Sequence, residues 1–199
     1  MIRNLVIATV GLAAAAFALP AAAQMNSSAF YAGLSIGQSK FSDACEGSVP
    51  AGFSVTCDDK DTAWRIFGGY QFHPNFAVEI GYSDLGRAQA TVSSGGLSGT
   101  AKVEATAFDA VVVGSWPINQ AFSLYGKFGL YHGEAKLTAS GTGVGSSSDK
   151  DTGSDLTYGL GARYDFNRNI GVRAEWQRYN DFSGSDIDVL SVGVLYRFR

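Results

Sequence analysis

Large apolar and small or polar positions alternate along most of the chain with a period of two residues. In residues 76–82 (FAVEIGY), large apolar side chains occupy the even-numbered positions, and Ala, Glu and Gly occupy the odd-numbered positions. The same alternation returns in residues 170–177 and 189–198. Side chains of a β-strand point alternately to its two faces, so this pattern predicts an all-β fold with one large apolar face.

Eight such segments are predicted as strands, at approximately 30–41, 61–72, 76–85, 102–116, 121–137, 156–166, 170–179 and 187–198. Tight connections at 73–75, 117–120 and 167–169 alternate with long ones at 42–60, 86–101, 138–155 and 180–186, which are rich in Gly, Ser and Asp. We expect the long connections to be mobile loops. This alternation is typical of an up-and-down meander, so we predict an eight-stranded antiparallel up-and-down transmembrane β-barrel with long loops on the outside.

The two faces of the predicted strands differ in size and charge. The interior of an eight-stranded barrel is only wide enough for side chains to fill, so the face rich in large rings is expected to meet lipid. The alternative is a soluble β-sandwich, because aromatic residues favour strands in general. The expected lipid face includes Trp64, Tyr70, Phe72, Phe76, Tyr82, Phe108, Trp116, Phe122, Phe128, Tyr158, Tyr164, Phe166, Trp176, Tyr196 and Phe198. The expected lumen face carries Arg65, Glu79, Asp109, Lys127, Arg163, Asp165, Arg173, Glu175 and Arg197 among glycines.

The N-terminal residues read as an export signal. Arg3 precedes an apolar run at 5–19, and Ala21–Ala23 offers a small-residue cleavage site. The alternative is a transmembrane anchor, but the run is short for a span of about 20 residues. We therefore predict a cleaved signal peptide at 1–23, followed by one outer-membrane β-barrel domain at 24–199 in a bacterial outer membrane.

Charge and cysteine content exclude some partners. The formal charge is −3, and loss of Arg3 with the signal takes it to −4, which argues against a nucleic-acid partner. Cys45 and Cys57 lie in one polar, turn-rich segment, and export would place them where disulfides persist, so we predict that they pair. Metal binding is the alternative, but no His or third Cys lies near them, and we expect no metal or cofactor.

Several motifs resemble the outer-membrane protein A-like family of small eight-stranded barrels. The segments FYAG at 30–33, GGYQF at 68–72, NFAVEIGY at 75–82 and SVGVLYRF at 191–198 are similar to that family's first strand, second hairpin and terminal strand. The resemblance implies that Tyr196 and Phe198 form the signal that the barrel-assembly machinery recognises. The family pattern ends on an aromatic residue, whereas Arg199 follows here. The chain stops at the eighth strand, so we expect no periplasmic peptidoglycan-binding domain.

The charged lumen residues are the best candidates for a functional site. Counted back from the tight turns, Asp109 is expected almost opposite Lys127, and Arg163 opposite Arg173, with Asp165 and Glu175 close enough to neutralise the two arginines. One interpretation is a salt-bridged plug that satisfies the interior. The other is a narrow or gated ion path, because lumen residues tune selectivity in barrels.

Catalytic and calcium-binding residues are poorly represented. His132 with Glu134 and nearby serines is the only set resembling a nucleophile and base, and residues of these types are expected together by chance. Asp149, Asp151 and Asp155 lack the ordered spacing and closing Glu of a calcium loop.

The sequence therefore predicts a non-enzymatic outer-membrane barrel with a structural or surface-presenting role through its outer loops. The alternatives are a channel for ions and small solutes and a lipid A-modifying enzyme. Expected partners are outer-membrane lipid and lipopolysaccharide, the barrel-assembly machinery, and a host or environmental ligand at the outer loops, with the protein as a monomer.

Overall fold

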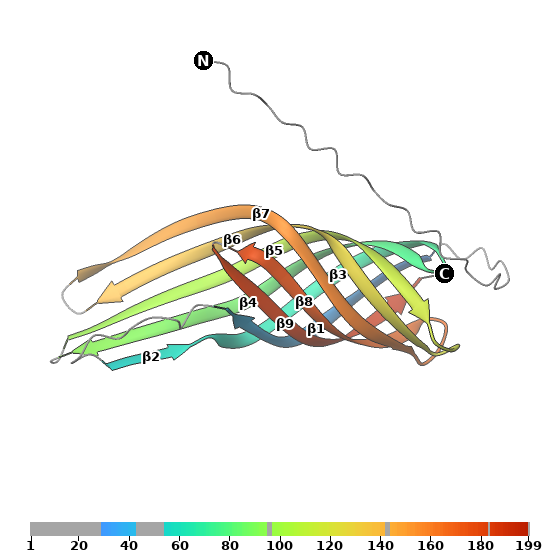
Figure 1. The fold of residues 1–199 in the computed structure, drawn as a ribbon, viewed down its shortest axis with the longest axis horizontal. Coiled ribbons are helices and arrows are strands. Elements are labelled where there is room, and N and C mark those ends of the chain that lie inside the picture. The colour runs from blue at the N-terminus through green and yellow to red at the C-terminus, as the bar shows by residue number, and fades with distance from the viewer. Residues whose placement is uncertain (1–28, 43–53, 95–96, 142–143, 183, 199) are drawn as a thin grey trace, which may run out of the picture.

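The computed structural model describes residues 29–42, 54–94, 97–141, 144–182 and 184–198, and all regular secondary structure in these ranges is β-strand (Figure 1). None of these ranges contains a helix that is long and apolar enough to cross a membrane. The predicted signal peptide at 1–23 lies outside the described residues. The strands are β1 Ala29–Phe41, β2 Ser54–Asp58, β3 Lys60–His73, β4 Phe76–Ser94, β5 Leu97–Pro117, β6 Phe122–Gly141, β7 Val144–Asp165, β8 Ile170–Phe182 and β9 Ser185–Arg197.

The strands form one closed antiparallel barrel. β1 pairs with β3, and from β3 to β9 each strand pairs with the next in the chain. β1 also pairs with β9, from Tyr31 opposite Arg197 to Phe41 opposite Ile187, and this pairing closes the barrel. β2 and β3 both pair with β4 and are separated by Asp59, so together they form one wall element and the barrel has eight. The predicted fold class is confirmed. Closure matters because an open sheet edge would leave unpaired backbone groups in lipid.

The three tight turns lie at one end of the barrel, as predicted. They connect β3 to β4, β5 to β6 and β7 to β8, and Figure 1 shows them at the end where the C-terminus lies. Asparagine side chains cap two of them: Asn119 Oδ1 accepts hydrogen bonds from the backbone of Ala121 and Phe122, and Asn167 Oδ1 does the same for Asn169 and Ile170. Such local bonds are the usual reason for Asn in turns.

The prediction of long mobile loops at the opposite end was wrong for most of their length. β4 continues to Ser94 and β5 begins at Leu97, while β6 continues to Gly141 and β7 begins at Val144, so these segments form two long hairpins beyond the barrel wall (Figure 1). Paired backbone groups of adjacent antiparallel segments satisfy each other, whatever the polarity of the side chains. In the same way, β2 occupies part of 42–60, and β8 and β9 leave little of 180–186 outside strands.

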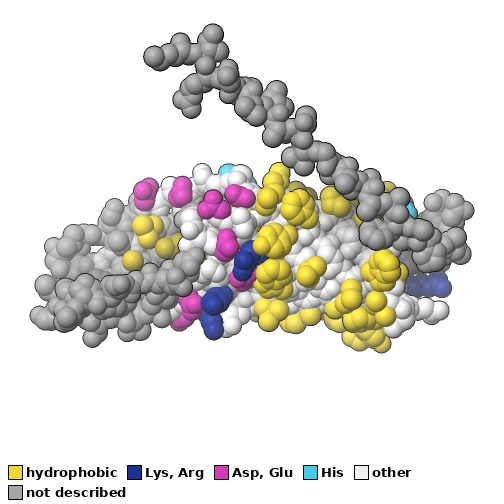
Figure 2. Space-filling model, viewed as in Figure 1, with side chains coloured by type: hydrophobic (Ala, Val, Ile, Leu, Met, Phe, Trp, Pro, Cys, Tyr) yellow, Lys and Arg dark blue, Asp and Glu magenta, His cyan; other side chains and the backbone are white. Residues whose placement is uncertain are grey.

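The outer surface of the barrel carries the expected apolar face. Trp116, Phe128, Phe166 and Leu190 are each at least 58% exposed. Figure 2 shows apolar side chains over the half of the barrel nearest the tight turns, and charged side chains border them toward the hairpin end. A protein in water rarely exposes so large an apolar surface, so this belt marks the part of the barrel in contact with lipid.

Candidate functional site in the barrel lumen

Three charged side chains from neighbouring strands meet at the centre of the lumen. The guanidinium of Arg65, on β3, donates from Nε and Nη2 to Asp109 Oδ2 and Oδ1 at 3.0 and 2.6 Å, and from Nη1 to Glu79 Oε1 at 2.8 Å. Asp109 and Glu79 lie on β5 and β4, and all three side chains are buried. A fork of donors is thus shared between two carboxylates, the geometry for which a guanidinium is best suited.

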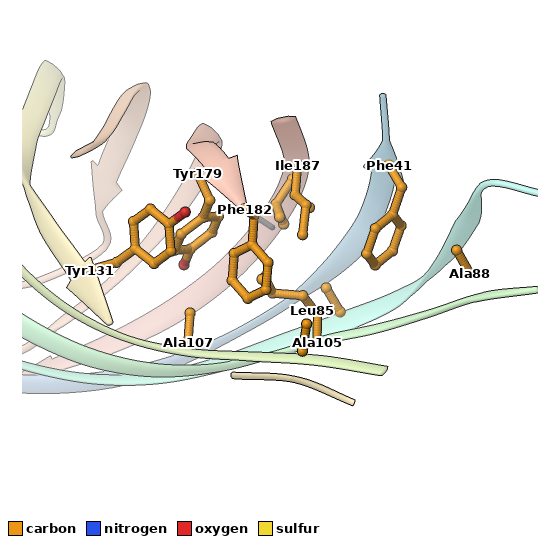
Figure 3. Packing of buried hydrophobic residues seen from close by; sticks show 12 residues of the cluster. Phe41, Leu85, Ala88, Ala105, Ala107, Tyr131, Tyr179, Phe182 and Ile187 are labelled. Carbon is orange, nitrogen blue, oxygen red and sulfur yellow. The ribbon is translucent and has the colours of Figure 1, made fainter. Parts of the chain in front are cut away.

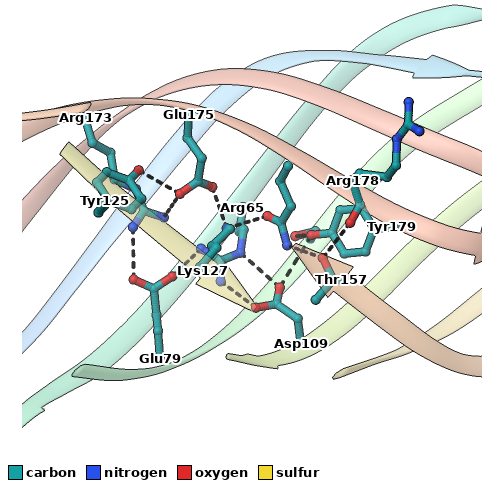
Figure 4. A network of polar contacts seen from close by, with 12 residues as sticks. Arg65, Glu79, Asp109, Tyr125, Lys127, Thr157, Arg173, Glu175, Arg178 and Tyr179 are labelled. Atoms are coloured by element: carbon teal, nitrogen blue, oxygen red, sulfur yellow. Dashed lines mark hydrogen bonds and ion pairs between the residues drawn. The ribbon is translucent and has the colours of Figure 1, made fainter. Parts of the chain in front are cut away.

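A second set of charges continues the network on the other side of the lumen (Figure 4). Lys127 Nζ, on β6, donates to Glu175 Oε1 and to Gln177 Oε1, both at 2.6 Å. Arg173 Nη1, on β8, donates to Glu79 Oε2 at 2.9 Å, while its Nη2 lies 3.7 Å from Glu175 Oε2. Arg173 therefore joins the two sets of charges.

The buried network is electrically balanced. It contains three cations, Arg65, Lys127 and Arg173, and three carboxylates, Glu79, Asp109 and Glu175. Neutral side chains complete it on several sides: Tyr31, Tyr125, Gln177, Thr157, Ser83 and Tyr179. A balanced and hydrogen-bonded set is the form in which charges can be buried at an acceptable energy.

The predicted pairings across the strands have mixed outcomes. Arg163 lies opposite Arg173, but Asp109 lies opposite Tyr131 and Lys127 opposite Val113, so the expected Asp109–Lys127 pairing was wrong. The β5–β6 turn closes between Pro117 and Ser123, further along the chain than expected, and the partner shifts by four residues. An even shift keeps every side chain on its predicted face, so both charges still point into the lumen.

Arg163 and Asp165 lie apart from the central network, near the end with the tight turns. Arg163 Nε is 3.3 Å from Asp165 Oδ2, and Arg197 Nη2 is 3.7 Å from Asp165 Oδ1. These side chains are partly exposed, so this group lies at the tight-turn end of the lumen rather than at its centre.

Apolar layers close the lumen on both sides of the network. The layer toward the tight turns includes Tyr31, Phe67, Val111 and Leu195. The layer toward the hairpins is larger and is shown in Figure 3; it contains Phe41, Ala63, Leu85, Ala88, Ala105, Ala107, Tyr131, Ala135, Tyr179, Phe182, Ile187 and Val189. The cavity beside Arg65 and Glu175 measures only about 10 Å³, about the space of one water. At the level of the charge network, the described side chains therefore leave little open space in the lumen.

Most residues of the apolar layer toward the hairpins were not predicted from the sequence. Phe182 lies in a segment predicted as a loop, yet it is 6% exposed and stacks on Tyr131 with ring centroids 5.4 Å apart. Gly133 makes room for it, because a Cβ there would lie 2.4 Å from the Phe182 ring. The signal available in the sequence was an aromatic residue, Phe182, within an otherwise polar stretch.

The residues considered for catalysis are only partly brought together. His132 Nδ1 lies 2.8 Å from Ser154 Oγ on the neighbouring strand, at an exposed position. Glu134 instead accepts a hydrogen bond from Lys150 Nζ at 2.7 Å, and this bond holds the pKa of Glu134 below its usual range. No carboxylate is hydrogen-bonded to His132 among the described residues, so the group that would orient a catalytic base is missing there.

The remaining predicted site residues have separate positions. Cys57 belongs to β2, and Cys45 lies outside the described residues, so the disulfide stays a prediction. Tyr196 and Phe198 are 48% and 52% exposed on the lipid face, with ring centroids 5.1 Å apart. No group of three or more His, Cys, Asp or Glu in the described ranges could hold a metal ion.

A closed eight-element barrel with a lipid-facing belt and a filled lumen defines a small transmembrane barrel of the bacterial outer membrane. Residues 9–198 match the model of the family described as outer membrane protein beta-barrel domain, and the chain belongs to that family.

Curated relatives and solved structures agree with this assignment. The chain is 32% identical over 204 residues to outer membrane protein A of Klebsiella pneumoniae, across 92% of this chain and 54% of that protein. It is 28% identical over 196 residues to outer membrane protein A of Shigella flexneri, across 95% of this chain and 54% of that protein. The chain therefore spans about half the length of these relatives. The crystal structure of neisserial surface protein A shares the fold, with a TM-score of 0.58 and 18% identity over 85% of this chain and 97% of that one.

Proposed function

We propose that this protein is a non-enzymatic outer-membrane barrel whose filled lumen stabilises the wall and whose long outer hairpins are presented to the cell exterior. The observation that carries the proposal is the balanced charge network enclosed between two apolar layers. An ion crossing this lumen would have to displace both the paired charges and the packed rings. A network of this kind supports a stable wall better than a conduction path.

Single-channel recording in planar bilayers tests the closed lumen. Folded protein, identified by a gel band that shifts on boiling, is expected to give no stepwise current above the bare membrane, while a wide porin in the same bilayer conducts. Discrete current steps from the folded protein would favour the alternative, a narrow or gated channel.

Mass spectrometry of lipid A tests the absence of catalysis. Cells that express the protein are expected to have the same lipid A masses as cells without it, because the His132–Ser154 contact lacks an orienting carboxylate in the described structure. A mass change that is lost in His132→Ala would establish a lipid A-modifying enzyme instead.

The proposal includes export and assembly. We infer cleavage after Ala23, recognition of Tyr196 and Phe198 by the barrel-assembly machinery, contact with outer-membrane lipid and lipopolysaccharide, and a monomeric state. The outer hairpins are the proposed contact surface for a host or environmental ligand. A measured mass equal to that of residues 24–199 would support the export step. A mass that still includes residues 1–23 in the membrane-bound protein would contradict it.

A further inference from the structure

A cavity opens above the outer apolar layer, where the two long hairpins leave the barrel. Its volume is about 440 Å³, and β1 and each of the strands from β4 to β9 contribute to its lining. Ligand pockets in proteins typically have volumes of about 300–1,000 Å³, so this cavity is large enough for a small organic molecule.

The floor of the cavity is apolar and packed. Phe41, Phe182 and Ile187 are 6%, 6% and 1% exposed, and Ala88 and Ala135 lie beside them at 8% and 6%. Figure 3 shows the side chains of Phe41, Phe182 and Ile187 between the strands. The rings separate the cavity from the charge network beneath, so a molecule bound here would rest on apolar side chains without reaching the lumen.

The rim of the cavity is acidic. Asp149 and Asp151 on β7 line it, opposite Leu137 and Ala135 of β6. Lys150, which lies between the two aspartates, points to the other face and binds Glu134 there. None of the lining residues that the structure describes is basic, so the two carboxylates have no cation within the cavity to neutralise them.

We propose that this cavity binds a small amphiphilic cation, with its apolar body on the Phe41–Phe182–Ile187 floor and its ammonium group beside Asp149 and Asp151. The apolar floor contributes burial of hydrocarbon, and the rim contributes charge complementarity. This site goes beyond the structural role proposed above, and it is independent of whether the lumen conducts, because it lies on the outer side of the apolar layer.

Methyl NMR of the folded full chain in phosphatidylcholine nanodiscs tests the proposal, with hexyltrimethylammonium as the probe and hexanoate as its anionic counterpart. Alanine methyl groups provide internal reporters, since Ala101 and Ala135 line the cavity whereas Ala174 faces lipid. The expected result is a saturable shift at Ala101 and Ala135 with the cation, a weaker response to hexanoate, and no shift at Ala174. Equal shifts at Ala174 would mean that the probe only dissolves in the bilayer, and would overturn the proposal.

Charge variants separate the rim from general surface charge. Asp149→Asn with Asp151→Asn is expected to weaken cation binding by roughly threefold to tenfold, the range for two exposed charge contacts. Glu104→Gln with Glu134→Gln removes the same amount of charge from β5 and β6, at positions outside the cavity lining, and is expected to leave the affinity unchanged. Equal affinities for both double variants would refute the role of the rim.

A space-filling variant tests the floor. Ala135→Leu, read out at Ala101, is expected to abolish the saturable shift while the gel band still shifts on boiling. Undiminished binding in the folded variant would overturn the location. If that variant does not fold, the pair of charge variants still decides the proposal.

Discussion

Replacing Glu79 by Gln should unbalance the charge network at its centre. Glu79 accepts hydrogen bonds from Arg65 at 2.8 Å and from Arg173 at 2.9 Å, and it is 2% exposed. The substitution keeps the shape of the side chain but changes the charge of the network from zero to +1. Removing one partner of a buried ion pair costs about 3–5 kcal/mol, and because Gln still offers one acceptor we expect a loss of about 3 kcal/mol.

Urea unfolding from phospholipid vesicles measures this loss. Trp64 and Trp116 are 45% and 60% exposed on the lipid face, so their fluorescence reports the exit of the wall from the bilayer. Glu134→Gln is the control, since it removes an exposed carboxylate of the outer hairpins, and we expect no measurable change in the free energy of unfolding. An equal free energy of unfolding for Glu79→Gln and Glu134→Gln would refute a stabilising network.

A second substitution tests whether the change in network charge causes the loss of stability in Glu79→Gln. Arg173→Met in the Glu79→Gln background returns the network to zero charge and removes a guanidinium whose Nε and Nη2 have no hydrogen-bond partner. The double variant is expected to be more stable than Glu79→Gln alone by about 1 kcal/mol or more, the scale of coupling between residues in one network. Additive losses would show that charge balance is not the cause.

Three further predictions concern the wall, the terminal strand and the cysteines. Gly81→Ala places a Cβ 2.4 Å from the Arg65 guanidinium and should lower the free energy of unfolding by about 1–3 kcal/mol. Gly126→Ala is the control, because its Cβ would lie 3.5 Å from a Leu160 methyl group, and we expect no change in the free energy of unfolding. Equal effects of the two substitutions would contradict this prediction. Phe198→Ala should reduce the fraction of the protein in cells that is assembled, measured as the gel band that shifts on boiling. Phe166→Ala, which removes a phenylalanine ring at the same end of the barrel, should reduce this fraction less. Equal fractions for the two variants would count against an assembly role of Phe198. Alkylation of the unfolded protein without reductant should leave its mass unchanged if Cys45 and Cys57 are paired, and two added alkyl groups would refute the disulfide.

The wall of the barrel could be predicted from sequence because one local property decides it. Alternation in segments such as 76–82 assigns each side chain to lipid or lumen, and the tight turns at 73–75 and 167–169 fix the direction of the chain. These signals need no knowledge of distant contacts. They are sufficient to place Arg65, Glu79 and Lys127 in the lumen.

The partners inside the lumen could not be predicted in the same way. Glu79 and Arg173 are 94 residues apart, on β4 and β8, and meet only because the closed wall brings them together across the interior. The outer hairpins were missed for a different reason. Their inward positions carry small residues such as Ala88, Ala101 and Ala105, which give no clear alternation of large apolar and polar side chains, although β4 and β5 pair from Arg87 opposite Glu104 to Ser94 opposite Leu97.

β5 continues well past the lipid belt and carries the outer hairpin away from the membrane. Phe108, at 50% exposure, is the last large lipid-facing ring on this strand before Leu97, where the strand begins. At about 3.4 Å per residue, the intervening ladder is on the order of 35 Å long. A contact made near such a tip lies well away from the lipid belt, so substitutions there change the contact surface without disturbing the part of the barrel that lies in the bilayer.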